Sequence, residues 1–445
     1  MRAWPLLFLL GCTEVVLVDA RRDAGRDGGS FSDAAPVDAS FEDSSLGDAG
    51  GSDAGPPPTS GPVLYPVGDR HSPISTDLAT ALAARATMPR DEDVFMKVGD
   101  SITVSTAFLN CFAGTNVDLD GRPLDATLTH FRGGDAAGSS PFTRDSRAAV
   151  VGWSANAPLA GDPSPLDQEH AALDPRFAVV MYGTNDVGFR ETEAFARDLW
   201  TITDTLLARG TIPLLSSIPP RDDSASADAK VPLYNLAVRA LAQGRGVPFV
   251  DYHRELLPLA NHGLAGDGVH PQVAGAGGCV LTADALRQGY NVRNLLVLEQ
   301  LDRARRALGG EALDAAPPRL GGTGTSTDPH VVTSLPFAAM GDTRGAPSDA
   351  IDVYGCSSAN ESGPERFYRF ELASRTTVRV AALSASGVDV DVHVVDDTAT
   401  GAGCVMRANR ELEVTLDAGT WFVVVDSFVD GTPLAGEYLV VIEPR

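Results

Sequence analysis

The stretch Val98-Gly99-Asp100-Ser101-Ile102-Thr103 follows the run Val94-Phe95-Met96-Lys97. We expect a buried strand over 94–98, a turn that Gly99 permits, and a helix from Ser101 to about Cys111. A serine in this place lies at the carboxyl edge of a sheet, where open α/β folds bind their ligands. The free N–H groups and positive end of a helix suit the stabilisation of an oxyanion. Ser101 is therefore a candidate nucleophile, unless it only caps the helix.

The region around this stretch alternates strand-like and helical patterns, which is typical of a parallel α/β sheet. We place this domain at residues 63–308. Strands are expected at 94–98, 148–151, 177–182, 212–218 and 247–252. Helices are expected at 191–208, at 233–243, after Pro271 and near 295–301, from apolar residues at helical spacing and from the preference of proline for a first turn.

The first residues resemble an export signal. Arg2 supplies one positive charge, and Leu6–Leu10 form an apolar core far shorter than the ~20 residues of a membrane-spanning helix. Leu9-Leu10-Gly11-Cys12 resembles a bacterial lipobox, in which Cys12 receives lipid; the alternative is a buried strand with a free cysteine. We therefore expect a signal peptide over 1–12 and an exported protein, either a lipoprotein of the outer membrane or cell surface or a secreted protein.

Residues 13–62 are rich in Asp, Ala, Gly, Ser and Pro. Such a composition cannot bury enough apolar surface to order itself, so we expect a disordered tether. The chain of 445 residues has a formal net charge of −24. That charge argues against nucleic acid as a partner and against electrostatic binding to anionic membranes, which leaves the lipid anchor as the expected membrane contact. The sequence does not indicate an oligomeric state.

Four of the five cysteines remain once Cys12 is set aside, an even number for an oxidising compartment. They are Cys111, Cys279, Cys356 and Cys404, and all four are disulfide candidates. The pairs Cys111–Cys279 and Cys356–Cys404 keep each bridge inside one predicted domain, although spacing does not prove the connectivity. No C-x-x-C motif or Cys/His cluster indicates zinc, and we expect neither a metal nor an organic cofactor.

Three polar blocks follow predicted strands of the α/β domain. They are Gly99-Asp100-Ser101, Gly183-Thr184-Asn185-Asp186 and Asp267-Gly268-Val269-His270. Because the carboxyl ends of parallel strands meet at one edge of the sheet, we expect the three blocks to form a single site there.

The residue types in these blocks predict acyl transfer to a serine. A serine hydroxyl needs a base within hydrogen-bond reach, and His270 can act as that base. Asp267 can hold the imidazole in one tautomer and stabilise the imidazolium that forms. The tetrahedral intermediate needs hydrogen-bond donors, which the Ser101 N–H and the Asn185 side chain offer. We therefore predict Ser101, His270 and Asp267 as the catalytic residues.

The three blocks resemble the motifs of the SGNH (GDSL) hydrolase family in order and spacing, over about residues 90–300. Gly-Asp-Ser-x-Thr matches 99–103, Gly-x-Asn-Asp matches 183–186, and Asp-x-x-His matches 267–270. The resemblance implies a flavodoxin-like three-layer α/β/α sandwich with a parallel sheet. It also implies Ser-His-Asp hydrolysis of esters, commonly those of acetylated sugars or lipids.

The family also implies a glycine N–H in the oxyanion hole. Gly152, within Val150–Ala155, best matches that position, and Gly133-Gly134 is the alternative. We expect Asp186 to fix the Asn185 loop and Asp100 to brace the serine turn.

The composition changes again after the α/β domain. Residues 309–330 are rich in Gly, Pro, Ala and Thr and are expected to be a linker. Beyond them the hydrophobic pattern has a period of two, so we predict an all-β sandwich at 331–445. Its strands are expected at 367–372, 377–380, 388–392, 413–416, 421–425 and 438–442. With Asn360–Tyr368 before its strands and Ala418–Phe422 late in the domain, it resembles the bacterial pre-peptidase C-terminal (PPC) domain. The resemblance implies an accessory module of secreted enzymes that can bind glycan.

One stretch of this domain, Val388–Val395, places Asp389, Asp391 and His393 on the same face of a strand, and Asp396-Asp397 follow in the turn. We expect that face to be solvated. Carboxylates placed in this way could instead bind calcium.

These observations favour a serine ester hydrolase that forms an acyl-Ser101 intermediate: a carboxylesterase, a carbohydrate acetylesterase or a lipase-like enzyme. Its substrate is expected to be an ester of a carbohydrate or lipid. Two alternatives stay open. One is a non-catalytic, glycan-binding surface lipoprotein, and the other is an acyltransferase with the same triad.

Overall fold

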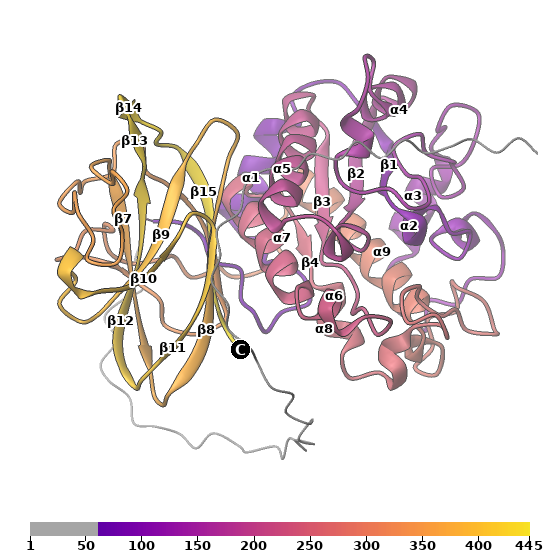
Figure 1. The fold of residues 1–445 in the computed structure, drawn as a ribbon. Coiled ribbons are helices and arrows are strands. Elements are labelled where there is room, and N and C mark those ends of the chain that lie inside the picture. The colour runs from indigo at the N-terminus through magenta and orange to yellow at the C-terminus, as the bar shows by residue number, and fades with distance from the viewer. Residues whose placement is uncertain (1–60) are drawn as a thin grey trace, which may run out of the picture. The chain divides into compact units, whose positions relative to one another are not determined.

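A four-stranded parallel sheet forms the centre of the first half of the chain (Figure 1). The computed structural model describes residues 61–445. The strands are β1 (Asp91–Gly99), β2 (Pro175–Met181), β3 (Ile212–Ser216) and β4 (Phe249–Val250), side by side in that order. Every residue of β2 and β3 is buried, as expected of parallel strands that are covered on both faces. The predicted signal peptide, Cys12 and nearly all of the predicted tether lie outside the described residues.

The strand predicted at 148–151 is reduced to a single bridge, in which Ala149 pairs in parallel with Gly99. Its two hydrogen bonds, both 3.2 Å long, join Gly99 to the two chain neighbours of Ala149. The prediction of a full strand is wrong because the chain turns away directly afterwards, at Gly152, whose φ is 77°. When this bridge is counted, the strand order is 2-1-3-4-5, that of a flavodoxin-like fold.

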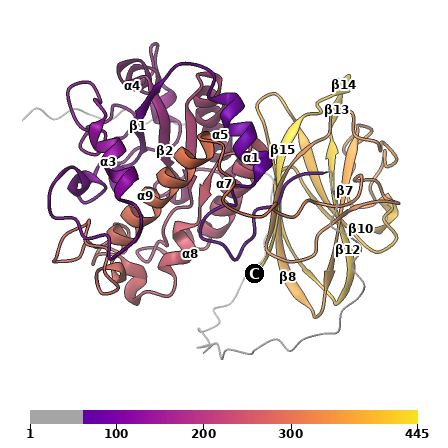
Figure 2. The same cartoon turned by 180° about the vertical axis from the view of Figure 1, so that it is seen from behind.

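Helices cover both faces of this sheet, so the expected three-layer architecture is confirmed. In Figures 1 and 2, α5 and α7 lie on one face and α3 and α9 on the other. The longer helices are α1 (Thr76–Arg85), α3 (Asp125–Gly133), α4 (Pro165–Leu173), α5 (Thr192–Ala208), α7 (Val231–Arg245) and α9 (Gly289–Leu308). The short ones are α2 (Ser101–Val104), α6 (Ala225–Asp228) and α8 (Tyr252–Leu256).

The helix predicted from Ser101 to about Cys111 ends after one turn, at Val104. Ser105 leaves the helical region, with φ −52° and ψ 134°. Beyond it, the side chain of Asn294 on α9 accepts from the Leu109 N–H and donates to the Ala107 carbonyl, both at 2.9 Å. A buried polar side chain from a distant helix therefore satisfies backbone groups that a longer helix would have paired internally.

The helix predicted directly after Pro271 is also absent. The chain runs as a loop to the short 3-10 turn Ala285–Arg287, and the next helix is α9, which includes the apolar stretch expected to be helical. Gly277, at φ 118°, breaks any helical path. The side chain of Asn291 accepts from the Ala274 N–H at 3.0 Å and so holds the loop against α9.

The second half of the described chain is an all-β sandwich, as predicted. One sheet has the order β10-β9-β12-β7-β5 and the other β11-β8-β15-β6. The strands are β5 (His330–Val331), β6 (Phe337–Asp342), β7 (Glu365–Leu372), β8 (Thr376–Ser384), β9 (Val390–Val395), β10 (Cys404–Ala408), β11 (Glu411–Leu416), β12 (Gly419–Ser427) and β15 (Glu437–Pro444), with a small hairpin of β13 (Val429–Asp430) and β14 (Thr432–Pro433). Alternate apolar residues such as Val392, Val423 and Val440 meet between the sheets.

The face of β9 that carries Asp391 and His393 is buried, so the prediction of a solvated face is wrong. A small second core of Ile351, Tyr354, Phe367, Val395, Phe422 and Val424 covers it. The Tyr354 ring stacks on His393, with 3.6 Å between the ring centroids. The segment that supplies Tyr354 lies outside the strands, and its position was not apparent from the alternating pattern.

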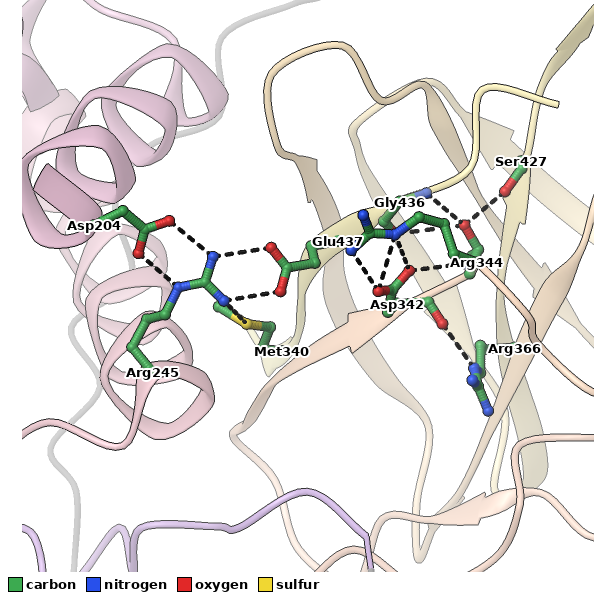
Figure 3. Close-up of polar contacts among 10 residues, drawn as sticks. Asp204, Arg245, Met340, Asp342, Arg344, Arg366, Ser427, Gly436 and Glu437 are labelled. Atoms are coloured by element: carbon green, nitrogen blue, oxygen red, sulfur yellow. Dashed lines mark hydrogen bonds and ion pairs between the residues drawn. The ribbon is translucent and has the colours of Figure 1, made fainter. Parts of the chain in front are cut away.

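The sheet that contains β6, β8 and β15 packs against α5 and α7. Ala338, Leu383, Leu439 and Val441 belong to the same hydrophobic core as the residues of the α/β domain. At the edge of this contact, the Arg245 guanidinium donates to Asp204 at 2.7 and 2.9 Å and to Glu437 at 2.8 and 2.9 Å (Figure 3). The outer face of this sheet therefore joins the apolar core of the α/β domain, while the space between the two sheets of the sandwich holds a separate core.

In the part of the chain that the structure describes, no helix combines the length and apolar character needed to cross a membrane.

Candidate active site

The serine turn is built by two residues that precede Ser101. Gly99 ends β1 with no room for a side chain, because a Cβ there would lie 2.3 Å from Thr103 Oγ1 and 2.6 Å from the Met181 carbonyl oxygen. Asp100 is the N-cap of α2, and its Oδ1 accepts from the Ile102 N–H at 3.0 Å. Ser101 is thus the first helical residue, directly beyond the carboxyl end of β1.

Ser101, His270 and Asp267 form a line of hydrogen bonds. Ser101 Oγ lies 2.9 Å from His270 Nε2, and His270 Nδ1 lies 2.7 Å from Asp267 Oδ2. With Nδ1 donating to the carboxylate, Nε2 is left to accept the hydroxyl proton. The three predicted catalytic residues are therefore brought together, from positions up to 169 residues apart in the chain.

The Asp267 carboxylate is held ionised in this arrangement. Its Oδ1 accepts from the N–H groups of Val269 and His270, both at 3.0 Å. Partial burial alone would raise its pKa, but these two hydrogen bonds and the contact with the imidazole outweigh burial and lower the pKa to about 2. A negative charge therefore faces His270 Nδ1 at any ordinary pH.

The three predicted oxyanion donors also lie on the loops at this edge of the sheet. Asn185 Nδ2 donates one hydrogen to the Trp153 carbonyl at 2.8 Å, which joins the Asn185 loop to the loop after Gly152 and leaves a second hydrogen. Among the described residues, neither the Ser101 N–H nor the Gly152 N–H has a protein acceptor. The alternative glycine, Gly134, lies against Asp93, near the amino end of β1 and so at the opposite end from Ser101.

Asp186 and Asp100, expected to brace these loops, are both fully buried. The Asp186 carboxylate accepts from the Ala155 N–H at 3.2 and 3.3 Å and pairs with Arg190 at 2.9 Å. It therefore ties the loop after Gly152 to the Asn185 loop, and burial raises its pKa. Burial likewise raises the pKa of Asp100, to about 6.

Sequence reasoning missed Arg221, which links two of the three loops. Its guanidinium donates to the Thr184 carbonyl, next to Asn185, and to Asp223 at 2.7 and 2.8 Å. A Cβ at Gly268, in the catalytic loop, would lie 2.7 Å from the Asp223 N atom, so these segments are in close contact. The position of Arg221 shortly after β3, at the same edge of the sheet, is the signal that could have identified it.

Sequence reasoning also missed a second Asp–His pair, next to the loop that carries Asp267 and His270. His262 Nδ1 lies 2.8 Å from Asp222 Oδ1, and His262 adopts a left-handed conformation, with φ 48°.

Two disulfides are present, Cys111–Cys279 and Cys356–Cys404. The first joins the segment after α2 to the loop after His270. Cys356, Cys404 and His393 have side-chain atoms close enough to surround an ion, but both sulfurs are in the disulfide and are not thiolate ligands.

A protein-family model matches most of the α/β domain. Residues 98–277 match the family model described as the GDSL-like lipase/acylhydrolase family. This part of the chain is a GDSL-like hydrolase domain. The protein is an ester-hydrolysing enzyme, as the sequence predicts. Among curated proteins, none matches the chain.

Solved structures resemble both halves of the protein. A GDSL-like lipase from Bacteroides thetaiotaomicron is 17% identical and covers 52% of this chain and 98% of its own, with a TM-score of 0.33. An acetylxylan esterase from Geobacillus stearothermophilus is 15% identical and covers 47% and 93%, with a TM-score of 0.31. The pre-peptidase C-terminal domain of a Bacillus anthracis collagenase is 13% identical and covers 26% and 96%, with a TM-score of 0.19.

Proposed function

We propose that the GDSL-like domain hydrolyses its ester through an acyl-Ser101 intermediate. The supporting observation is the hydrogen-bonded line from Ser101 Oγ through His270 to Asp267. His270 Nε2 takes the hydroxyl proton as Oγ bonds to the carbonyl carbon. The carbonyl oxygen becomes an oxyanion that the Ser101 N–H, the Gly152 N–H and the Asn185 amide stabilise.

This tetrahedral intermediate collapses to acyl-Ser101 and the free alcohol. The bond from the carbonyl carbon to the alcohol oxygen breaks, and His270 gives its proton to the departing alcohol. Water next attacks the acyl-serine, His270 takes a proton from that water, and Ser101 Oγ leaves and recovers the proton. In the transferase alternative, a second alcohol attacks in place of water.

We propose that the preferred substrate is a short acyl ester on a carbohydrate. The side chains of His270 and Asp267 are 42% and 51% exposed, so the catalytic base is accessible to an ester carried by a bulky molecule. An acetyl group needs no long channel for its acyl part.

A lipid-like ester is the second candidate, and a separate observation favours it. Val151 and Phe189 are large apolar residues that are 67% and 71% exposed. They lie on the two loops that carry Gly152 and Asn185, where an acyl chain could cover them.

The experiment compares hydrolysis of p-nitrophenyl acetate, octanoate and palmitate, and of acetylated xylan, by the wild type and by the Ser101→Ala and His270→Ala variants. Loss of about 10³-fold or more in kcat in both variants supports the mechanism. Preference for acetate identifies the short-acyl substrate, and preference for octanoate or palmitate identifies the lipid-like one. A fluorophosphonate probe that labels the wild type but not Ser101→Ala shows a live nucleophile even where these esters are poor substrates. A wild type that neither hydrolyses nor labels contradicts the proposal and favours the glycan-binding alternative.

We also propose that the enzyme is exported and anchored by lipid at Cys12. The lipobox-like sequence Leu9–Cys12 supports this, as does the composition of residues 13–62, which favours a tether. We further propose a hydrolase domain at 63–308, a linker at 309–330 and an accessory domain at 331–445. Metabolic labelling with a radioactive fatty acid should mark the wild type and not Cys12→Ala. Unmarked wild-type protein found in the medium would indicate secretion instead.

A further inference from the structure

Negative charge that develops at Ser101 needs a source of stabilisation besides the short helix α2. A helix running to Cys111 was expected to present its positive end to the oxyanion, but α2 has only four residues. One turn aligns few peptide dipoles, so its contribution is small. A full positive charge lies close to the same turn, on Arg293 of α9.

Arg293 contacts the two residues that follow the nucleophile. Its Nη1 donates to the Ile102 carbonyl at 2.8 Å, and its Nη2 donates to Thr103 Oγ1 at 2.9 Å. The guanidinium carbon lies 3.7 Å from the centre of the Phe108 ring. Asp100 Oδ1 accepts from the Ile102 N–H, so Asp100 and Arg293 together hold both backbone polar groups of Ile102.

Arg293 is a buried arginine without a direct ion pair in the part of the chain that the structure describes. The residue is 1% exposed, it forms no ion pair among the described residues, and its Nε has no hydrogen-bond partner. Arg176 is equally buried, yet it pairs with Glu92 at 2.6 Å. Burial lowers the pKa of Arg293, which the nearby Tyr252, Tyr290 and Asp100 partly oppose. A buried cation without a direct ion pair costs folding free energy, and groups that carry such a cost are concentrated at functional sites.

The same turn of α9 also holds the segment that follows His270. Asn291 Nδ2 donates to the carbonyls of Gly277 and Val280, both at 2.9 Å. Asn294 donates to the Gly278 carbonyl, also at 2.9 Å. Arg293 therefore projects from a part of α9 that is fixed to the chain on the histidine side of the site as well.

We infer that Arg293 is a positioning residue for ester hydrolysis: it holds the Ser101 turn and places a fixed positive charge beside it. The inference rests on the proposed acyl-Ser101 mechanism. The hydrogen bonds set the direction of the Ser101 N–H, and the charge, in a medium of low polarity, favours the oxyanion over the neutral ester.

The test replaces Arg293 with three residues that separate these effects. Arg293→Met removes the charge and the donors, Arg293→Gln keeps donors without charge, and Arg293→Lys keeps the charge without the planar fork. We expect kcat for p-nitrophenyl acetate to fall about 10- to 100-fold in the Met variant, with KM within about twofold, and the Lys variant to exceed the Gln variant. Arg176→Met is the matched control, a buried arginine whose contacts are Glu92, Gly210 and Met88. Per folded molecule, its kcat should match the wild type.

Two further readouts separate this inference from the mechanism on which it rests. Hydrogen exchange at the amides of 101–104 should accelerate in Arg293→Met and not in Arg176→Met, whatever the enzyme hydrolyses. Fluorophosphonate labelling of the wild type tests the nucleophile independently. Unchanged exchange and unchanged kcat in Arg293→Met would overturn the inference. If the Met variant does not fold, a Gln variant as active as the Lys variant, at equal melting temperature, would overturn the electrostatic part.

Discussion

At the scale of single residues, the site depends on neighbours that admit little variation. Gly99 leaves no space for a Cβ, Asp100 caps the turn, and Asp267 accepts two backbone N–H groups besides facing the imidazole. Each of these residues fixes the direction of a reacting group next to it. Substitutions here should therefore alter kcat more than substrate binding.

Replacing Asn185 by Ala should lower kcat about 10²- to 10³-fold with little change in KM, because a donor to the oxyanion is lost. The side chain also donates to the Trp153 carbonyl, so part of the effect can come from a displaced loop. Steady-state kinetics with p-nitrophenyl acetate measures the loss, and Asn185→Asp, which keeps the size but has no hydrogen to donate, should lose at least as much. A kcat within threefold of the wild type would exclude Asn185 from the oxyanion hole.

Replacing Asp267 by Asn should lower kcat by about 10³- to 10⁴-fold, because an amide can stabilise the other imidazole tautomer. Since the Asp267 pKa is about 2, its ionisation should not appear in the pH profile of kcat/KM between pH 4 and 9. The measurement is that profile for both proteins. An acid limb that vanishes in Asp267→Asn would show instead that this carboxylate titrates in the working range.

At the scale of elements, the sandwich carries carboxylates in register on three neighbouring strands. In the strand register, Asp391 on β9 lies opposite Asp426 on β12, and Asp426 lies opposite Glu365 on β7. Glu361 lies nearby, and Arg407 contacts Asp391 at 2.8 Å and Glu361 at 3.5 Å. All four carboxylates are buried, and the single positive charge of Arg407 cannot neutralise four negative charges.

This cluster should make the sandwich less stable as the pH rises. Burial, and then the proximity of Asp391, raises the pKa of Glu361 to about 8. Burial likewise raises the pKa of Asp426 to about 9. In the unfolded chain such groups titrate near pH 4, so the folded state retains protons that the unfolded state has lost. The stabilisation is complete below about pH 4 and is lost as the pH rises through about 8 and 9.

Thermal unfolding between pH 5 and 9 measures this effect. The melting temperature of the wild type should fall toward pH 9, and Glu361→Gln and Asp426→Asn should flatten the decline. Glu371→Gln, an exposed carboxylate on β7, should not change it. Equal slopes in all four proteins would show that the buried carboxylates are neutralised in another way.

At the scale of the whole molecule, one sheet of the β-sandwich packs into the apolar core of the hydrolase. Leu439 on β15 is fully buried within the core of the α/β domain, and Arg245 on α7 pairs with Glu437 on β15. An apolar contact of this kind favours cooperative unfolding over independent domain motion.

Leu439→Ala should therefore cost about 2–5 kcal/mol and destabilise both halves together. Denaturant unfolding, followed by esterase activity and by Trp421 fluorescence in a protein lacking the other tryptophans, should show both signals shifting to the same lower midpoint. Val405→Ala, at an exposed position of the sandwich, should shift neither midpoint. Loss of activity at a different denaturant concentration from the fluorescence change would show that the halves unfold separately.

The sequence by itself determined the fold class and the residues that meet at the site. Local patterns were sufficient for this, because apolar runs mark the parallel strands and the three blocks follow strand ends that share one edge. Thus Ser101, Asn185 and His270 were identified from their positions after β1, after β2 and in a loop beyond β4 and α8.

Only the tertiary structure decided the features that depend on contacts between distant residues. Asn294 satisfies the backbone beyond Val104, so α2 ends early, and Asn291 holds as a loop the segment predicted to be a helix after Pro271. Tyr354 covers a strand face whose alternation predicted exposure to solvent. Arg293 lies within an otherwise ordinary helical pattern, and its contact with the serine turn spans 190 residues. Local propensity contains no information about such partners, because the hydrogen bonds and burial that decide each case come from another part of the chain.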